Sequence, residues 1–89
     1  MVTVKRIVLD VLKPHQPDAL AFSRELASLG EGYRVFLEVE EIDEDTQTLR
    51  LEISGKSIEL APIEEKIASL GASIHSIDQV EVLNEADGS

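Results

Sequence analysis

The sequence predicts an α+β domain in which two helices cover one face of a four-stranded antiparallel sheet. Three observations lead to this fold class. Four segments alternate apolar and polar residues, which is typical of half-buried strands. Two other segments repeat apolar residues at spacings of three and four, which is typical of amphipathic helices. The order is strand, helix, strand, strand, helix, strand, and each strand–helix–strand half favours a right-handed crossover.

The first half of the chain is predicted to hold a strand, a helix and a second strand. The first strand covers residues 4–13, and its alternation separates Ile7, Leu9 and Val11 from the residues between them. Two prolines then end the strand, and a helix begins near Gln16 or Pro17. Gly30 ends this helix, and the second strand covers residues 33–42.

The second half repeats this order after a polar hairpin at residues 43–46. The third strand covers residues 48–54, the second helix covers about residues 60–70, and Gly71 ends it. The last strand covers residues 72–83. The predicted arrangement is therefore ferredoxin-like, with the apolar first and third strands at the centre of the sheet. One domain is expected over residues 1–83, followed by a polar tail at residues 84–89.

Composition excludes several classes of function. The chain has 18 acidic and 8 basic side chains, a net charge of −10, so nucleic acid is not an expected partner. It has no cysteine, which excludes disulfides, thiolate metal sites and cysteine nucleophiles. It shows no signal peptide and no apolar run long enough to cross a membrane, so a cytoplasmic protein without membrane contact is expected.

The sheet face that the helices leave open is predicted to be an interface. A single open face is polar in most monomers, but this one carries large apolar side chains among paired charges. The predicted interface residues are Val8, Leu12, Phe36, Arg34 and Arg50. A small domain also gains stability by association, so a homo-oligomer is expected. The alternative is that these are isolated surface residues of an ordinary kind.

A dense acidic run covers residues 38–45 and is the candidate cation site. Hard cations such as calcium or magnesium prefer carboxylate oxygens, and the predicted ligands are Glu38, Glu40, Asp43 and Asp45. Strand alternation places Glu38 and Glu40 on one face and Glu41 on the other. The spacing does not match an EF-hand. The alternative is a solvated hairpin and edge strand whose charges prevent edge-to-edge pairing.

The histidines give no catalytic assignment, and no cofactor is predicted apart from the cation. His75 lies on the last strand and is expected to approach Asp10 on the first, whereas His15 lies before the first helix. An enzyme would require these three groups to converge. No spacing of Ser, His and Asp supports hydrolysis, and no histidine pair supports zinc. The prediction is that the protein is not an enzyme.

Two segments at the ends of the chain resemble a known family. They are Arg6-Ile-Val-Leu-Asp-Val-Leu-Lys-Pro-His15 and His75-Ser-Ile-Asp-Gln-Val80, and the segments around Glu41-Ile-Asp43, Ser57-Ile-Glu and Glu64-Glu65-Lys-Ile67 fit the same pattern. Together they resemble the mainly archaeal domain of unknown function 211 over about residues 4–82. The resemblance implies a ferredoxin-like fold and closed rings of subunits, without an established activity.

These observations leave two non-enzymatic hypotheses for the function, beside a third in which an enzyme uses Asp10, His15 and His75. The first is a small ring-forming protein that binds calcium or magnesium through acidic residues. The second is a regulatory module that binds a small molecule, as amino-acid-binding domains of the same topology do. The Gly30-Glu-Gly32 turn is the feature that favours the second hypothesis.

Overall fold

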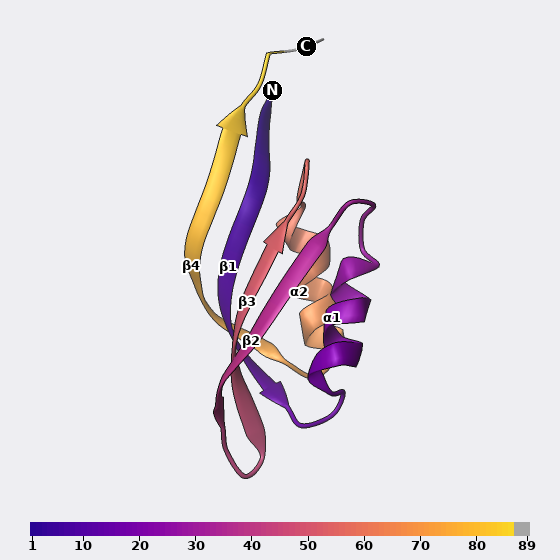
Figure 1. The fold of residues 1–89 in the computed structure, drawn as a ribbon, viewed down its shortest axis with the longest axis vertical. Helices are drawn as coiled ribbons and strands as arrows, with labels where there is room; N and C mark the ends of the chain where they lie inside the picture. Colours follow the sequence, from indigo (N-terminus) through magenta and orange to yellow (C-terminus); the bar gives the residue numbers. More distant parts are fainter. Residues whose placement is uncertain (87–89) are drawn as a thin grey trace.

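The computed structural model describes residues 1–86 and confirms the predicted α+β fold (Figure 1). The element order is strand, helix, strand, strand, helix, strand. The elements are β1 (Val2–Pro14), α1 (Ala19–Ala27), β2 (Arg34–Ile42), β3 (Thr46–Ser54), α2 (Leu60–Ser69) and β4 (Ser73–Asn84). Both helices lie on one side of the sheet, which makes the arrangement ferredoxin-like (Figure 1).

The four strands form one antiparallel sheet in the order β2-β3-β1-β4. The two central strands are therefore β3 and β1, as their apolar sequences predict. Alternate residues of these strands point towards the helices and are fully buried. The core consists mainly of Ile7, Leu9, Val11, Leu49, Leu51 and Ile53 from the sheet, and Phe22, Leu26, Ile63 and Ile67 from the helices.

The two helices end in structurally different ways, although both carry the sequence Ala-Ser-Leu-Gly at their C-terminal end. Helix α2 ends in a Schellman motif, in which Gly71 adopts a φ of +84° and the Ala72 N–H donates to the Ile67 carbonyl at 3.1 Å. Helix α1 ends without this motif. Gly30 does not adopt a positive φ, but a Cβ atom there would lie 2.5 Å from the Tyr33 ring. The repeated sequence is therefore not a shared stop signal.

Helix α1 begins later than the two prolines predict. Its first residue is Ala19, and the Asp18 carboxylate accepts a hydrogen bond from the Ala21 N–H at 2.8 Å. This contact is a side-chain cap, which satisfies one of the free N–H groups of the first turn. Residues 15–17 instead form a loop between β1 and α1.

Strands β1 and β4 continue beyond the other two strands and form an arm, so the molecule measures 50 × 22 × 18 Å (Figure 1). The arm reaches the N-terminus, where the Glu85 N–H donates to the Met1 carbonyl at 2.7 Å. Asn84 is the last residue of β4, so the predicted tail begins inside the sheet. The last three residues of that tail, 87–89, lie outside the described residues.

The alternation of the sheet is interrupted at four places. In each case one strand has an extra residue that faces no partner in the register, as in a β-bulge. The four extra residues are all ionisable: Lys5, Glu40, His75 and Asp78. A one-residue shift reverses the face of every later side chain, so these positions decide which charges share a face.

Neither helix within residues 1–86 has the length and hydropathy that a membrane span requires.

Candidate functional site

Acidic and basic side chains are interleaved on the open face of the sheet. A row here is a set of register partners on neighbouring strands. In the row that contains Asp10, the register places Glu38 beside Arg50 and Arg50 beside Asp10. The row through Arg6 places Glu81 beside it on β4 and Ser54 beside it on β3. Acidic and basic side chains therefore alternate across the strands. This interleaving places both Arg6 and Arg50 next to acidic side chains of neighbouring strands.

One ionic contact organises the centre of this face. The Arg6 guanidinium donates to the Glu52 carboxylate through Nε at 3.0 Å and through Nη2 at 3.1 Å, and Nη1 donates to Gln79 at 2.9 Å. The hydrogen bond from Arg6 lowers the pKa of Glu52, and the same bond raises the pKa of Arg6. Arg6 thus joins strands β1, β3 and β4.

The predicted interface residue Val8 does not present an apolar surface. Its register partners are Glu52 on one side and Gln79 on the other, and Arg6 binds both of them. These polar side chains enclose Val8, which is only 1% exposed. Strand alternation places Val8 on the open face correctly, but the Arg6 contacts bury it within the chain.

The other predicted interface residues are accessible. Leu12 is exposed, and Phe36 is 59% exposed beside Arg34. Arg34 and Phe36 line a cavity of about 210 Å³ together with Glu52 and Ser54. Phe36 is therefore a large apolar side chain with charged neighbours.

A second cavity of the open face contains the predicted Asp10–His75 pair. Its volume is about 240 Å³, and Asp10, Val11, Leu12, Thr48 and His75 line it. Strands β1, β3 and β4 all contribute to it, because Thr48 is the register partner of Leu12 and His75 lies on β4.

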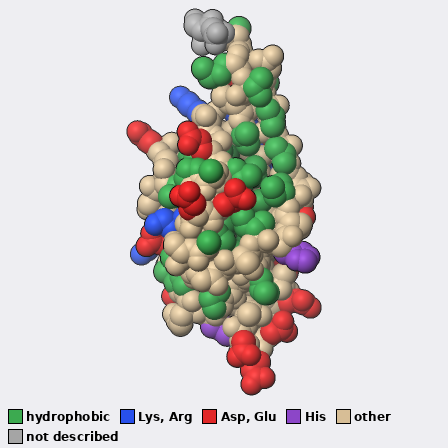
Figure 2. Space-filling model, turned by 180° about the vertical axis from the view of Figure 1, so that it is seen from behind, with side chains coloured by type: hydrophobic (Ala, Val, Ile, Leu, Met, Phe, Trp, Pro, Cys, Tyr) green, Lys and Arg blue, Asp and Glu red, His purple; other side chains and the backbone are tan. Residues whose placement is uncertain are grey.

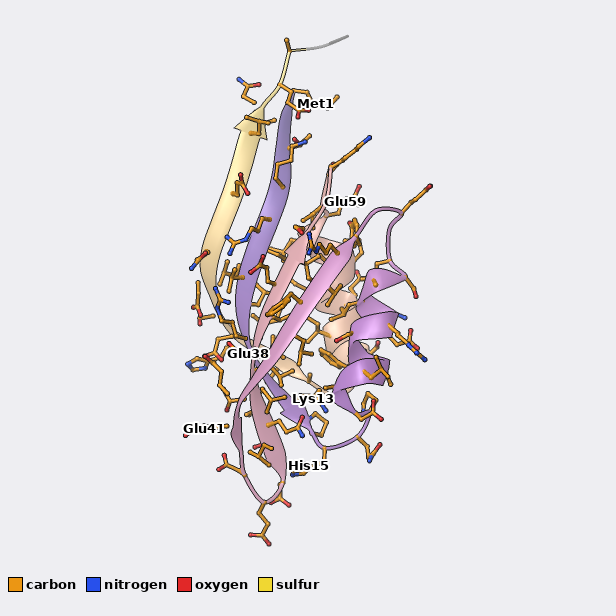
Figure 3. The ribbon with its side chains drawn as sticks, in the orientation of Figure 1. Met1, Lys13, His15, Glu38, Glu41 and Glu59 are labelled. Atoms are coloured by element: carbon orange, nitrogen blue, oxygen red, sulfur yellow. The ribbon has the colours of Figure 1, made fainter. Side chains whose placement is uncertain are left out.

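His15 does not line this cavity. Its Nε2 atom lies 2.9 Å from the Asp43 carbonyl oxygen and 3.0 Å from that of Glu44, so it binds the β2–β3 hairpin (Figure 3). Both neighbours are acceptors, which requires Nε2 to carry the proton. The three groups that an enzyme would need therefore do not converge.

The acidic run is arranged differently from its prediction. Glu40 is the extra residue of a register shift, so Glu41 faces Thr48 while Glu38 faces Arg50. Glu38 and Glu41 consequently share the open face, and simple alternation wrongly pairs Glu38 with Glu40 (Figure 3). Within residues 1–86, no three His, Cys, Asp or Glu side chains form a group that could hold a metal ion. The predicted ligands Glu38, Glu40, Asp43 and Asp45 thus form no such group in one chain.

Lys13 is a buried cation that the sequence does not identify as important. Strand alternation places it on the helix side, where it is fully buried. Its Nζ donates to the carbonyl oxygens of Pro14 at 2.8 Å, of His15 at 3.5 Å and of Pro17. Burial lowers the pKa of Lys13 against the opposing effect of the nearby Asp18 carboxylate. Lys13 and His15 together hold the loop at the end of β1 (Figure 3).

Both outer edges of the sheet carry exposed apolar side chains. Strand β2 pairs only with β3 and strand β4 only with β1 in the described residues, so each has one free edge. The large exposed apolar residues of the two strands are Phe36, Val39, Ile42, Ile77, Val80, Val82 and Leu83. Hydrophobic side chains follow the arm, and acidic side chains gather at the opposite end of the molecule (Figure 2).

The comparison with known proteins identifies a family. The family model of the domain of unknown function DUF211, described as "Uncharacterized ArCR", matches residues 5–85. The chain belongs to the DUF211 family. The uncharacterized protein MJ0319 of Methanocaldococcus jannaschii is 43% identical over 77 residues, which are 86% of this chain and 79% of that protein. Membership confirms the resemblance seen in the end segments, and the DUF211 match continues two residues beyond the predicted domain end at residue 83.

The small-molecule hypothesis gains no support from the Gly30-Glu-Gly32 turn. Gly32 has a φ of +80°, which is a backbone requirement of the turn. Neither of the two cavities of the open face is lined by these residues.

Proposed function

We propose that this DUF211 protein is a non-catalytic subunit that assembles into a closed ring, with neighbouring subunits in contact through the two outer edges of the sheet. The observation that carries the proposal is the exposed apolar surface on both edge strands. Isolated domains seldom expose such surface on a long free edge, because free edges promote association.

The two edges differ in sequence, and the proposed contact joins one edge to the other, whereas a two-fold dimer joins an edge to its own copy. A contact between β2 of one subunit and β4 of the next is head-to-tail, and it closes into a ring when the rotation between subunits permits. The arm offers Ile77, Val80 and Val82, whose register partners Leu9, Ile7 and Val4 lie on the covered side of the sheet. A neighbouring subunit at this edge would therefore continue the apolar layer of the core.

Carboxylates at the same edges would provide a binding site for a divalent cation between neighbouring subunits. Strand β2 carries Glu40 and Glu41 near its end, and β4 carries Asp78 and Glu81. A β2–β4 contact would bring carboxylates of two chains together, and their repulsion would weaken it. Calcium or magnesium would relieve that repulsion and would take its oxygen ligands from both subunits.

Sedimentation velocity tests the assembly with one variant and a matched control. Val80→Lys should dissociate the ring into monomers, because a charge replaces an apolar side chain of the proposed contact. Val80 is 56% exposed at the β4 edge. Leu20→Lys makes the same kind of change at a 62% exposed position on α1 and should leave the particle size unchanged. A wild-type monomer at high micromolar concentration would contradict the proposal.

The cation is tested separately by sedimentation in EDTA, calcium and magnesium. The proposal expects the ring to weaken in EDTA and to recover with either cation. Glu41→Gln should reduce the dependence on the cation, and Glu25→Gln on α1 serves as a control of equal charge. A ring of unchanged stability in EDTA would remove the cation and leave the apolar contact.

A further inference from the structure

The cavity between Asp10 and His75 is a second candidate site, separate from the sheet edges. It has a volume of about 240 Å³. That room suits a ligand of few heavy atoms. The cavity combines an aliphatic wall at Leu12 with three polar side chains, a composition typical of small-ligand sites.

A register shift brings His75 into this cavity. Asp10 pairs with Ser76 and Val11 with Ile74, so His75 is the extra residue between them. Extra residues of this kind re-aim a side chain and are common beside binding sites. Regular alternation would place His75 and Ser76 on opposite faces of β4. The shift instead allows His75 to line the cavity with Asp10.

The three polar side chains of the cavity have unused hydrogen-bonding capacity. Within residues 1–86, the side chains of Asp10, Thr48 and His75 make no hydrogen bond and no ion pair at contact distance. Arg50 is the register partner of Asp10, yet it forms no such pair with it. Strand neighbours at other rows of the open face, such as Arg6 and Glu52, do bind each other.

We propose that this cavity binds the ammonium group of a small primary amine. A protonated amine has three N–H donors and one positive charge. The cavity offers three acceptors, which are the Asp10 carboxylate, the Thr48 hydroxyl and a ring nitrogen of His75. No Lys or Arg lines it, and the charge of −10 on the chain favours a cation. The alkyl part of the amine lies against Leu12.

The test is a titration of the wild-type protein with n-propylammonium chloride, followed by amide and side-chain NMR shifts. Saturable shifts at Asp10, Leu12, Thr48 and His75 are expected in the roughly millimolar range, because the ligand has few heavy atoms. n-Propanol has nearly the same shape without the charge and should produce no saturable shift. Equal binding of n-propanol would overturn the ammonium assignment.

Two charge-removing variants separate the site from general attraction to an acidic protein. Asp10→Asn should weaken binding about tenfold or more, since a charge-assisted contact is lost. Glu64→Gln removes one negative charge at an exposed position of α2, outside the cavity, and should bind as the wild type does. Equal weakening in both variants would show non-specific attraction and would refute the site.

A further variant addresses the geometry without a change of charge. Thr48→Val keeps the shape of the side chain but removes the hydroxyl acceptor, so binding should weaken several-fold. Far-UV circular dichroism confirms that each variant is folded. Titration with zinc chloride gives the remaining outcome, because shifts with zinc and none with the amine would assign a metal in place of the amine.

Discussion

The covered face and the open face of the sheet are made by alternate residues of the same strands, yet they are held together differently. The two phenylalanines of the chain illustrate the contrast. Phe22 packs on the covered face and is 0% exposed, whereas Phe36 lies on the open face and is 59% exposed. Apolar burial stabilises the covered face, while a few polar contacts order the open one. Substitutions on the covered face should therefore affect folding, and those on the open face should affect association.

The largest expected effect separates the two phenylalanines. Phe22→Ala should lower the free energy of unfolding by about 3–5 kcal/mol, because it leaves a cavity in the core. For a domain of this size the melting temperature should fall by about 12 °C or more. Phe36→Ala should change the free energy of unfolding of the monomer by less than about 0.5 kcal/mol. Guanidinium denaturation of both variants gives the comparison, and equal losses would contradict the assignment of the two faces.

An intermediate effect is expected at Lys13, the charged exception on the covered face. Lys13→Met keeps the length of the side chain but removes the donor to the loop carbonyls, so about 1–3 kcal/mol of stability should be lost. Lys56→Met, at an exposed lysine, should cost less than about 0.5 kcal/mol. Denaturant unfolding at pH 7 measures both variants.

The same lysine makes a prediction about pH. Burial lowers the pKa of Lys13 below its ordinary value of 10.5. At pH values between the lowered pKa and 10.5, the unfolded chain therefore binds more protons than the folded one. The stability of the wild type should therefore rise, relative to that of Lys13→Met, as the pH increases from 8 towards 10.5. A difference between the two proteins that does not change with pH would show that the lysine is solvated.

The smallest expected effect is on the open face. The Arg6 guanidinium lowers the pKa of Glu52 below 4.5, so the contact stabilises the fold above that pH and is lost as the pH falls through the lowered value. Glu52→Gln should thus be slightly less stable than the wild type at pH 7, and the two should converge in acid. Glu64→Gln on α2 provides a control without an ion pair, and acid unfolding curves that stay apart would argue against this prediction.

The covered face could be predicted from the sequence almost completely. Alternation identifies Ile7, Leu9 and Val11 as core residues, and the apolar spacings identify both helices. The period of two is a local property, and burial on one side of a sheet enforces it. Composition likewise places the most apolar strands at the centre.

The candidate sites could be predicted only in part. The approach of His75 to Asp10 follows from strand order alone, but the register shift that admits His75 to the cavity leaves no signal in the sequence. A similar shift at Glu40 exchanges the faces of two carboxylates. The Lys13 contacts fold the adjacent loop back onto the end of β1, and the His15 contacts reach the β2–β3 hairpin, so both depend on loop geometry that periodicity does not describe. The ring and its cation are properties of several chains and stay predictions.

The ends of β1 and β4 meet at the tip of the arm, and their direction decides how the molecule responds to force. The N–H of Glu85 binds the carbonyl of Met1, and the ladder below it runs across both strands. Pulling the two ends of the chain apart would load these bonds one after another, as in a zipper, and would need little force. Pulling between residue 1 and the β2–β3 hairpin would load many bonds in shear at the same time. The arm is consequently the mechanically weak part of the sheet, while the helix-covered half resists.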